Sequence, residues 1–473
     1  MKLWFNTLII SITYIALSNG YCSVYDAERI YYRTNSKSKF VRIARELIND
    51  GLYFTAVPFI KEYLTNVSQI DDKDVDDIVE DVVSEVGVKQ FEVLPIEILR
   101  KSSASIIRYV LAKKYFRKGK FSRALKNLSR ISSGQKIWPF ALHLKASIYS
   151  LGGKYGRAQN LFKKCAKASK IELRSETNSN KVKQLIMNRD NCIVGISRSQ
   201  FAGGDYKEAY LSYLDLSKKS IIWPEILFEE AWNSFYLRDF NRTLGKLVTY
   251  KAPLLNYIFN PEIEILRALT YLELCLWADT KKVVDSFYKK YQRQAVGLNR
   301  YLKKFRKKYK SYYLMAKLRN RRKIKGSKLL NQLLKDIIKD PAYLELYNAF
   351  QGGKKELSLI RNVKSRRFKR VLAKSLKASL ILQRDLTGAY VRKKLRKFQR
   401  KIQKSFEGMS YIKLEVIGRK KRELYGTQGD YDRGRGNIKN LERNDKQYFW
   451  TFNGEFWADE LGDYVFSLKP ECK

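Results

Sequence analysis

The chain has 473 residues and a formal net charge of +47, because 94 Lys and Arg outnumber 47 Asp and Glu. Hydrophobic residues make up 45% of it, which is enough for a packed core and argues against wholesale disorder. Eight prolines and 25 glycines are few for this length and favour helices, while one histidine and five cysteines leave little material for metal sites. We therefore expect a large, folded, strongly basic protein of two or three domains.

Residues 1–20 have the features of a secretory signal peptide. Lys2 precedes an apolar stretch at residues 8–17, and Ser18 and Gly20 supply small residues at the cleavage positions. The stretch is too short to span a bilayer comfortably, so we expect export and cleavage. A buried N-terminal helix is an alternative. A lipid anchor on Cys22 is another, although the preceding residues lack the run of small side chains that such a site needs.

An acidic stretch follows at residues 71–81. It resembles a calcium loop in composition, but it lacks the glycine at the turn position and the final bidentate glutamate. Valine and isoleucine recur at helical spacing through the stretch and just beyond it, and its acids lie where a helix dipole favours them. We therefore predict an amphipathic helix and no metal site. Its apolar face would consist of Val75, Ile78, Val79, Val82, Val83 and Val86.

Residues 115–250 contain two blocks that match 85 positions apart. Within each block a small residue recurs after 34 positions. Each small residue follows a turn residue and an aromatic residue, and a large side chain comes four positions later, as a tight helical hairpin requires. The turn-to-small segments are Gly119–Ala124, Gly153–Ala158, Gly204–Ala209 and Arg238–Thr243, and each block also carries a Trp-Pro pair, Trp138–Pro139 or Trp223–Pro224.

The 34-residue period is the length of one tetratricopeptide helix–turn–helix unit. Ala56 keeps this phase two periods before Ala124, and the longer step from Ala158 to Ala209 indicates an insertion, which we expect to form an irregular loop at residues 170–187. The chain resembles the tetratricopeptide-repeat superfamily over roughly residues 37–290. The resemblance implies an all-α fold, with a right-handed solenoid of about five to six helical hairpins within residues 21–290.

In this superfamily, variable positions on the first helix of each unit line the concave surface. By resemblance they imply a groove for an extended or acidic peptide of a protein partner. For Phe228 and Trp232, which share one helix, a place in the core is the alternative. The implied groove residues are Tyr109, Lys113, Arg117, His143, Arg198, Phe228, Trp232 and Tyr236.

Two of the five cysteines are candidates for a disulfide. Cys165 ends the second helix of one unit and Cys192 begins the first helix of the next. Consecutive elements pack together in a solenoid, and export implies an oxidising compartment, so these two could pair. Cys275 has the surroundings of a core thiol.

Two later stretches carry most of the excess charge. Residues 281–328 hold 19 Lys and Arg against one acid, and residues 361–404 hold 17 against one. Apolar residues at heptad spacing run from Tyr288 to Ala316, and a weaker seam runs from Phe368 to Ala389. We predict a basic helical hairpin or coiled coil over residues 291–425.

So basic a surface suits nucleic acid, anionic lipid headgroups or an acidic envelope polymer. Merely solvated helix faces are the alternative, but the scarcity of acids at i,i+4 spacing argues against it. No nucleic-acid-reading module is visible, which makes nucleic acid the less favoured partner. The residues predicted to contact an anionic membrane or polymer are Lys303, Lys304, Arg306, Lys307, Lys308, Arg321, Arg322, Lys323, Arg366, Arg367, Arg392, Lys393 and Lys394.

The chain lacks the common catalytic motifs G-x-S-x-G, H-E-x-x-H and Cys-x-x-Cys. We therefore expect no enzyme, no cofactor and no metal. Residues 426–473 combine a glycine-containing linker with a tail that has seven aromatic and four acidic residues between Gln447 and Tyr464. This composition suggests a small folded element or a docking peptide.

The Trp-Pro pairs, the loop at residues 252–262 and the tail are similar to secreted tetratricopeptide proteins of gliding and predatory deltaproteobacteria. That similarity implies a non-enzymatic scaffold of the cell envelope, in the periplasm or at the outer-membrane periphery of a Gram-negative bacterium, tied to motility or surface machinery. A cytosolic repeat protein that binds nucleic acid and an accessory factor of a cell-wall enzyme are the alternatives.

Overall fold

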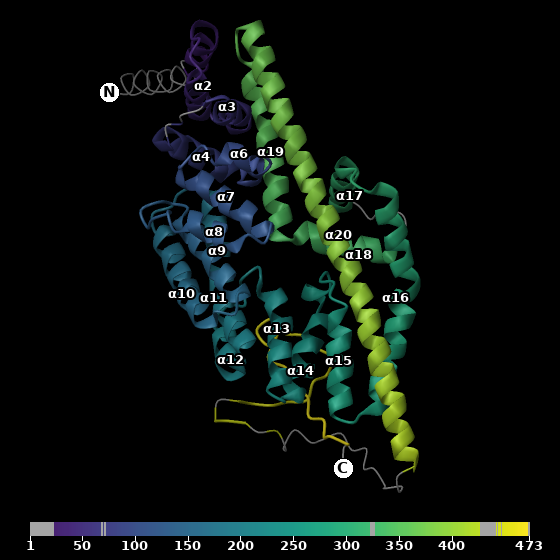
Figure 1. Ribbon diagram of the computed structural model, residues 1–473. Helices are drawn as coiled ribbons and strands as arrows, with labels where there is room; N and C mark the ends of the chain where they lie inside the picture. The colour runs from purple at the N-terminus through teal and green to yellow at the C-terminus, as the bar shows by residue number, and fades with distance from the viewer. Residues whose placement is uncertain are drawn as a thin grey trace, which may run out of the picture. The chain divides into compact units, whose positions relative to one another are not determined.

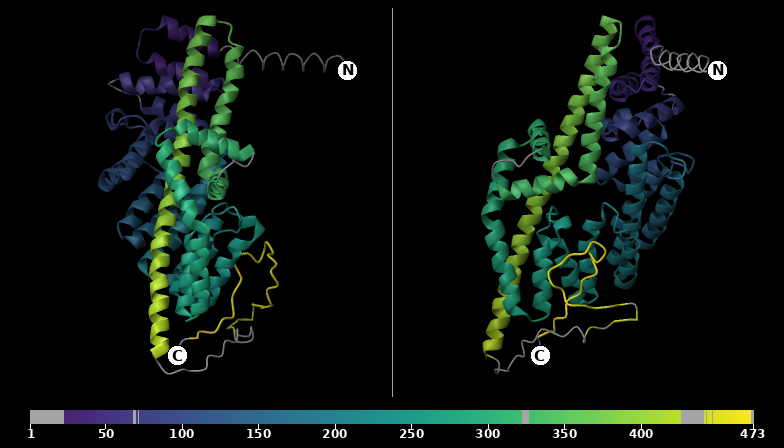
Figure 2. Two further views of the ribbon diagram at one scale, coloured as in Figure 1. Left: turned by 90° about the vertical axis from the view of Figure 1, so that its right-hand side faces the viewer. Right: turned by 180° about the vertical axis from the view of Figure 1, so that it is seen from behind.

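The computed structural model describes residues 23–67, 70, 72–321, 327–425, 441, 443–445 and 447–471. Within these residues all regular secondary structure is helical, which confirms the predicted all-α class (Figures 1 and 2). The expected signal peptide, Cys22, Cys472, Arg322, Lys323 and the side chain of Arg321 lie outside the described part.

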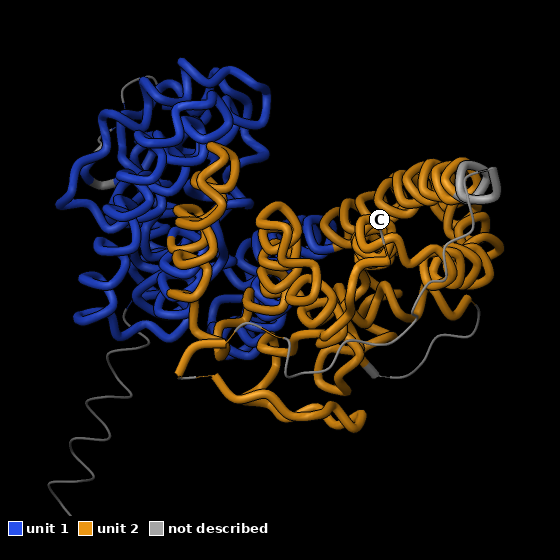
Figure 3. The backbone as a smooth tube through the Cα atoms, turned by 90° about the horizontal axis from the view of Figure 1, so that it is seen from below, with its two compact units in different colours: residues 1–192, 342–387 blue, residues 193–341, 388–473 orange. Residues whose placement is uncertain are grey.

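The chain forms two compact units, each made of two separate stretches of sequence (Figure 3). Unit 1 comprises residues 1–192 and 342–387, and unit 2 comprises residues 193–341 and 388–473. The boundaries fall within α11 (Ser179–Gly203), at the start of α19 (Pro341–Arg361) and within α20 (Arg366–Tyr425). Each unit thus joins part of the repeat region with part of the basic region.

The other helices divide between the two units. Unit 1 has a helical stretch at 23–33, followed by α2 (Lys39–Asn49), α3 (Tyr53–Asn66), α4 (Asp72–Val86), α5 (Lys89–Glu92), α6 (Ile96–Leu99), α7 (Ser105–Arg117), α8 (Phe121–Leu128), α9 (Trp138–Leu151) and α10 (Tyr155–Glu172). Unit 2 has α12 (Tyr206–Leu214), α13 (Trp223–Tyr236), α14 (Phe240–Val248), the short helices η1 (Thr249–Lys251) and η2 (Pro253–Leu255), α15 (Glu262–Glu273), α16 (Trp277–Phe305), α17 (Tyr309–Arg321) and α18 (Lys328–Lys339).

Six helix–helix connections in the described residues share one turn. In the α7–α8 turn, the N–H of Gly119 donates to Phe116 O and the N–H of Lys120 donates to Tyr115 O, which is the Schellman pattern at a helix end. The same pair of bonds recurs at the equivalent positions of the other five turns. The central residue is left-handed each time: Gly51, Gly119, Gly153, Gly204, Arg238 and Cys275, with φ between 59° and 89°.

The side chains around these turns repeat as well. Five positions after each left-handed residue lies a small side chain that is completely buried, which lets the two helices approach closely. The last of these, Thr280, belongs to the α15–α16 hairpin and was not identified from the sequence. The six small residues are Ala56, Ala124, Ala158, Ala209, Thr243 and Thr280, all with 0% exposure.

The expected irregular loop at residues 170–187 is largely wrong. Helix α10 continues to Glu172 and α11 begins at Ser179, so the inserted residues lengthen two helices instead of forming a long loop. The predicted amphipathic helix, by contrast, is present as α4, and all six of its predicted apolar residues are buried.

In unit 1, a carboxylate from α19 caps the start of α3. Glu356 accepts hydrogen bonds from the N–H groups of Phe54 (2.7 Å) and Thr55 (2.9 Å) and from the Thr55 hydroxyl (2.7 Å). These N–H groups have no partner inside the helix, so the carboxylate satisfies them. Burial raises the pKa of Glu356 to about 7, although these hydrogen bonds oppose the shift.

In unit 2, the part of α20 after residue 387 packs along α15, α16 and α17. Phe398 meets Phe259 edge to face, Phe406 meets Phe287, and the Ser410 hydroxyl lies 2.8 Å from that of Tyr288. Helix α16 ends at Phe305, so the predicted continuous seam to Ala316 is divided between α16 and α17. No glycine or proline marks the break. Like charges spaced four residues apart weaken a helix there, as for Lys303 with Lys307.

Candidate functional site

Three of the four predicted groove residues of unit 1, all on α7, lie in an internal charge cluster. On α7, Lys113 Nζ is 2.9 Å from Glu92 Oε1 and Arg117 pairs with the other oxygen of the same carboxylate. Tyr109 is buried beneath Lys113. Burial alone would raise the pKa of Glu92, but Lys113 and Arg117 hold it below its usual value. In this state both cations already have a partner within the chain.

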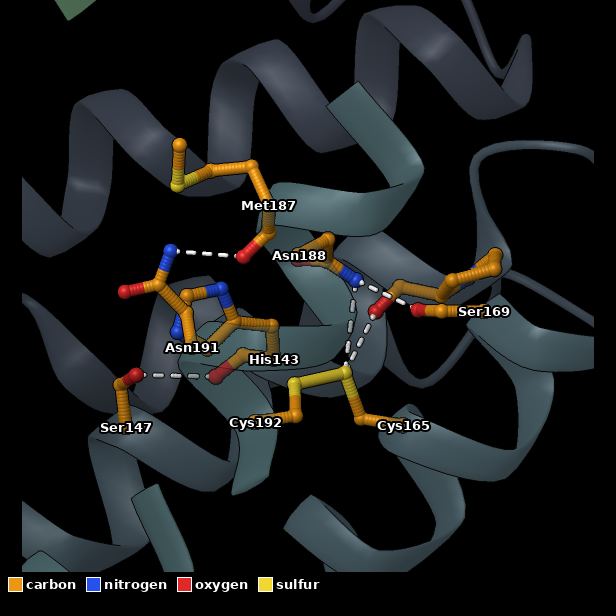
Figure 4. Close-up of a disulfide and its surroundings, with 9 residues drawn as sticks. His143, Ser147, Cys165, Ser169, Met187, Asn188, Asn191 and Cys192 are labelled. Carbon is orange, nitrogen blue, oxygen red and sulfur yellow. Dashed lines mark hydrogen bonds between the residues drawn. A yellow bond between two sulfur atoms is a disulfide. The ribbon is translucent and has the colours of Figure 1, made fainter. Parts of the chain in front are cut away.

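His143 lies on α9 with its ring 5.9 Å from that of Phe162 on α10. Nearby, Cys165 of α10 and Cys192 of α11 form a buried disulfide with a Cα–Cα distance of 6.1 Å (Figure 4). The Asn188 amide donates to Ser169 Oγ and to Cys165 Sγ beside it. The disulfide thus joins the two helices that contain the insertion. Cys275, expected as a core thiol, is disulfide-bonded as well.

The predicted groove residues of unit 2 have mixed surroundings. Arg198 forms a two-pronged ion pair with Glu229, at 2.8 and 2.6 Å. Phe228 and Trp232 pack against the buried Ala231, Leu247 and Leu266, in accordance with the core interpretation.

Tyr236 is 49% exposed and stacks on Tyr206. The eight predicted groove residues therefore divide equally between the two units, and most are engaged within the chain.

The basic residues around the end of α16 have a different environment. Lys303, Lys304, Arg306, Lys307 and Lys308 are all exposed, and within the described part of the chain none of these five side chains forms an ion pair. We call these five residues the basic turn. Arg306 follows the last residue of α16 and has a positive φ of 41°. Residues 286–320 contain no Asp or Glu at all, so no acid of this stretch can neutralise the turn.

Helix α20 brings further cations to the basic turn. Arg392 Nε donates to Arg306 O, and the Tyr312 hydroxyl donates to the same carbonyl at 3.3 Å. A cation at the carbonyl end of α16 is favoured by the helix dipole. Helix α20 can approach the start of α17 closely because Gly388 has no side chain. A Cβ at this position would lie 2.0 Å from Tyr309 O.

The remaining predicted basic residues differ in their exposure and in their ion pairs. Lys393 is exposed, but Lys394 is mostly buried and pairs with Asp340, which also accepts from the Tyr390 hydroxyl at 2.6 Å. Burial lowers the pKa of Lys397, and the nearby cations Lys394 and Lys401 lower it further. Arg366 and Arg367 are exposed at the start of α20, in unit 1.

Contacts between distant parts of the chain escaped the sequence analysis. The Glu356 cap joins residues 301 or more positions apart, and the tail segment 459–471 lies on α13 and α14, more than 200 positions away. A local signal for the tail contact existed, namely Gly245 in the middle of a helix, where glycine is unfavourable. Among the described residues, no group of His, Cys, Asp and Glu is placed to hold a metal ion. No helix in the same residues is both long and apolar enough to cross a bilayer.

No family model and no curated protein matches the sequence.

Proposed function

We propose that the protein is a non-enzymatic interaction scaffold of the bacterial cell envelope, built from tetratricopeptide-like hairpins, which docks onto an anionic surface through the basic turn. Support for the repeat comes from the six connections, which have the same hydrogen-bond pattern and are each followed by a buried small residue. Hairpin repeats of this kind offer extended surfaces for protein partners.

The observation that carries the docking proposal is the unpaired charge of the basic turn. Five exposed cations lie within six positions, and Arg392 of α20 lies directly beside them. Exposed cations that served only folding would gain from nearby carboxylates, and no acid occurs in residues 286–320. The charge is therefore available for a partner outside the chain.

Anionic lipid headgroups or a phosphate-bearing polymer are the partners that this surface suits best. Each cation near an anionic membrane contributes about 1 kcal/mol, and the attraction decays within about 8 Å at physiological salt. The Cys165–Cys192 disulfide supports an oxidising compartment, in agreement with the expected export signal.

The test is binding to vesicles with and without phosphatidylglycerol, at low and high salt. Replacing all five residues of the basic turn by Glu should lower the affinity for anionic vesicles at least about 100-fold, and salt should weaken wild-type binding steeply. Neutral vesicles should bind neither protein.

The matched control reverses five exposed cations of unit 1 in and beside α10, namely Lys154, Lys163, Lys164, Lys167 and Lys170, so that the net charge changes equally. An equal loss in both variants would contradict a local docking surface. RNA that competes with vesicles for the basic turn would favour the nucleic-acid alternative.

A further inference from the structure

The tail segment, residues 459–471, has no helix or strand of its own and lies against α13, α14 and the end of α15 within unit 2 (Figure 1). Residues 458–463 form turns, and residues 464–471 have no regular secondary structure. Within the segment the Asp463 N–H donates to Glu460 O (3.0 Å), and most of the other backbone groups must find partners outside the segment.

Helix α14 provides much of that backbone recognition. The side-chain amide of Asn241 donates to Leu468 O (3.1 Å) and accepts from Leu468 N (2.9 Å), while Asn241 O accepts from Phe466 N (3.1 Å). At the end of α15, Leu274 O accepts from Glu471 N (2.9 Å). These hydrogen bonds are formed with the backbone of the segment, so another extended segment of matching shape can form them as well.

The turn at the start of the segment is held by two lysines. Lys218 Nζ donates to Asp459 O (2.7 Å) and pairs with Asp463 Oδ2 (2.6 Å). Lys246, buried and paired with Glu230 at 2.6 Å, also donates to Gly462 O, and Gly462 N donates to Thr249 Oγ1. The surface is therefore positive where the segment is acidic.

Two glycines permit the close approach. A Cβ on Gly245 would lie 1.6 Å from Tyr464 O, so only glycine lets the segment cross α14 here. Glycine inside a helix costs about 1 kcal/mol relative to alanine, and the crossing segment explains its presence. Gly462 has φ of +94°, a conformation that glycine adopts freely.

Apolar side chains anchor both ends of the segment. Leu461 is 3% exposed, and Phe466 and Leu468 pack on the buried Leu244 and Leu274. The residues just before the segment are solvent-exposed: Tyr448, Trp450 and Trp457 are each at least 60% exposed. Buried apolar side chains, hydrogen bonds to the backbone and an ion pair are the contacts by which peptide-recognition sites bind their ligands.

We propose that this surface of α13 and α14 is a groove for an extended segment of a partner protein with the pattern Leu-Gly-acid followed by Phe-x-Leu, and that the chain's own tail segment occupies it as a competing ligand. The proposal is independent of the basic turn. An attached segment has an effective concentration in the millimolar range, so a partner must compete with it.

The experiment measures binding of a fluorescent peptide, residues 457–471, to three forms of the full chain. In the tail variant, Leu461, Phe466 and Leu468 are each replaced by Ser, which weakens the attached segment and leaves the groove unchanged. The groove variant combines those changes with Gly245→Ala. We expect the peptide to bind the tail variant at least about tenfold more tightly than wild type, and the groove variant to lose that gain.

Substitutions in the peptide test the pattern. Phe466→Ala should weaken binding about 100-fold and Gly462→Ala about fivefold, while a change at the solvent-facing Lys469 should have little effect. Cys275, which follows Leu274 in the sequence, is disulfide-bonded. Peptide binding is therefore measured before and after reduction, and the three forms should keep the same order of peptide affinity.

Several results would overturn the proposal. Loss of helicity in the tail variant would make the segment a fixed part of unit 2. Equal peptide affinity in all three forms would exclude the groove, and a dimer of wild-type protein that grows with concentration would assign the groove to a second copy. Hydrogen exchange of wild type provides an independent check: the N–H groups of Phe466 and Leu468 should exchange by local opening, well before those of α14.

Discussion

The acidic side of unit 1 and the basic turn of unit 2 handle charge in opposite ways. Around α4 and α5 two carboxylates have two cationic partners each: Glu92 pairs with Lys113 and Arg117, and Glu80 with Lys136 and Lys181. The basic turn has no such partners among the described residues and remains exposed. A paired, partly buried charge is part of the fold, whereas a cluster of unpaired exposed charge is free to act on something outside the chain.

We expect the effect of a substitution on stability to depend on whether the charge is paired, and not on the unit in which it lies. Lys246 and Glu230 in unit 2 are 4% and 5% exposed at the side chain and lie 2.6 Å apart. Glu230→Ala would leave a buried lysine without its carboxylate, so the free energy of unfolding should fall by about 4 kcal/mol. Chemical denaturation measures this, with the exposed Glu208→Ala as control. Equal effects of the two changes would remove the distinction.

Glu356 extends the comparison to a buried carboxylate held by hydrogen bonds from N–H and O–H groups. Its pKa is about 7 in the folded protein against an ordinary 4.5. Between these values the unfolded chain loses the proton first, so the folded state binds more protons and stability falls as the pH rises. The contribution amounts to about 3 kcal/mol over this range.

Glu356→Gln removes the titrating group and should flatten the pH dependence of the unfolding free energy between pH 4.5 and about 7. Denaturant titrations of both proteins at the two pH values give the difference. Parallel pH profiles of wild type and variant would show that Glu356 does not titrate in this range.

Glu92→Ala tests the paired region itself. Lys113 would lose its carboxylate while remaining three-quarters buried, so the free energy of unfolding should fall by about 2 kcal/mol. Glu97, which is exposed on the neighbouring α6, supplies the control, and Glu97→Ala should change stability by less than about 0.5 kcal/mol. A silent Glu92→Ala would mean that the cluster is held by packing alone.

The smallest effect is expected inside the basic turn. Lys307 is exposed and unpaired in the described structure, so Lys307→Gln should change the free energy of unfolding by less than about 0.5 kcal/mol. It should still make vesicle binding measurably weaker and less dependent on salt. A clear loss of stability would mean that Lys307 has a structural partner.

The recurring turns were accessible from sequence because their determinants are local. Each turn needs a residue that tolerates a left-handed conformation and a small residue five positions later, and both are visible in Gly119 and Ala124. The small residue of the α15–α16 turn was not identified because Cys275 and Thr280 replace the glycine and alanine. The hydrogen bonds of the turn are nevertheless the same.

Other features depend on contacts that no local pattern shows. The buried face of α20 in unit 1 includes Ser379, Gln383 and Thr387, polar residues that a hydrophobic pattern cannot select. The buried Gln383 accepts a hydrogen bond from the Gln90 amide and donates one to Leu346 O, and both partners are distant in sequence. The candidate site divides in the same way. The charge of the basic turn was visible in the sequence, whereas the ion pairs of Lys113 with Glu92 and of Lys394 with Asp340 were not.

The most direct test of the central claim measures the free energy of unfolding and the affinity for anionic vesicles on the same two variants. One is Glu92→Ala, and the other has all five residues of the basic turn replaced by Glu. We predict that the first loses stability and keeps its vesicle affinity, while the second keeps its stability and loses its affinity at least about 100-fold. If the variant of the basic turn unfolded more easily and bound vesicles as wild type does, its charge would belong to the fold and the account would be contradicted.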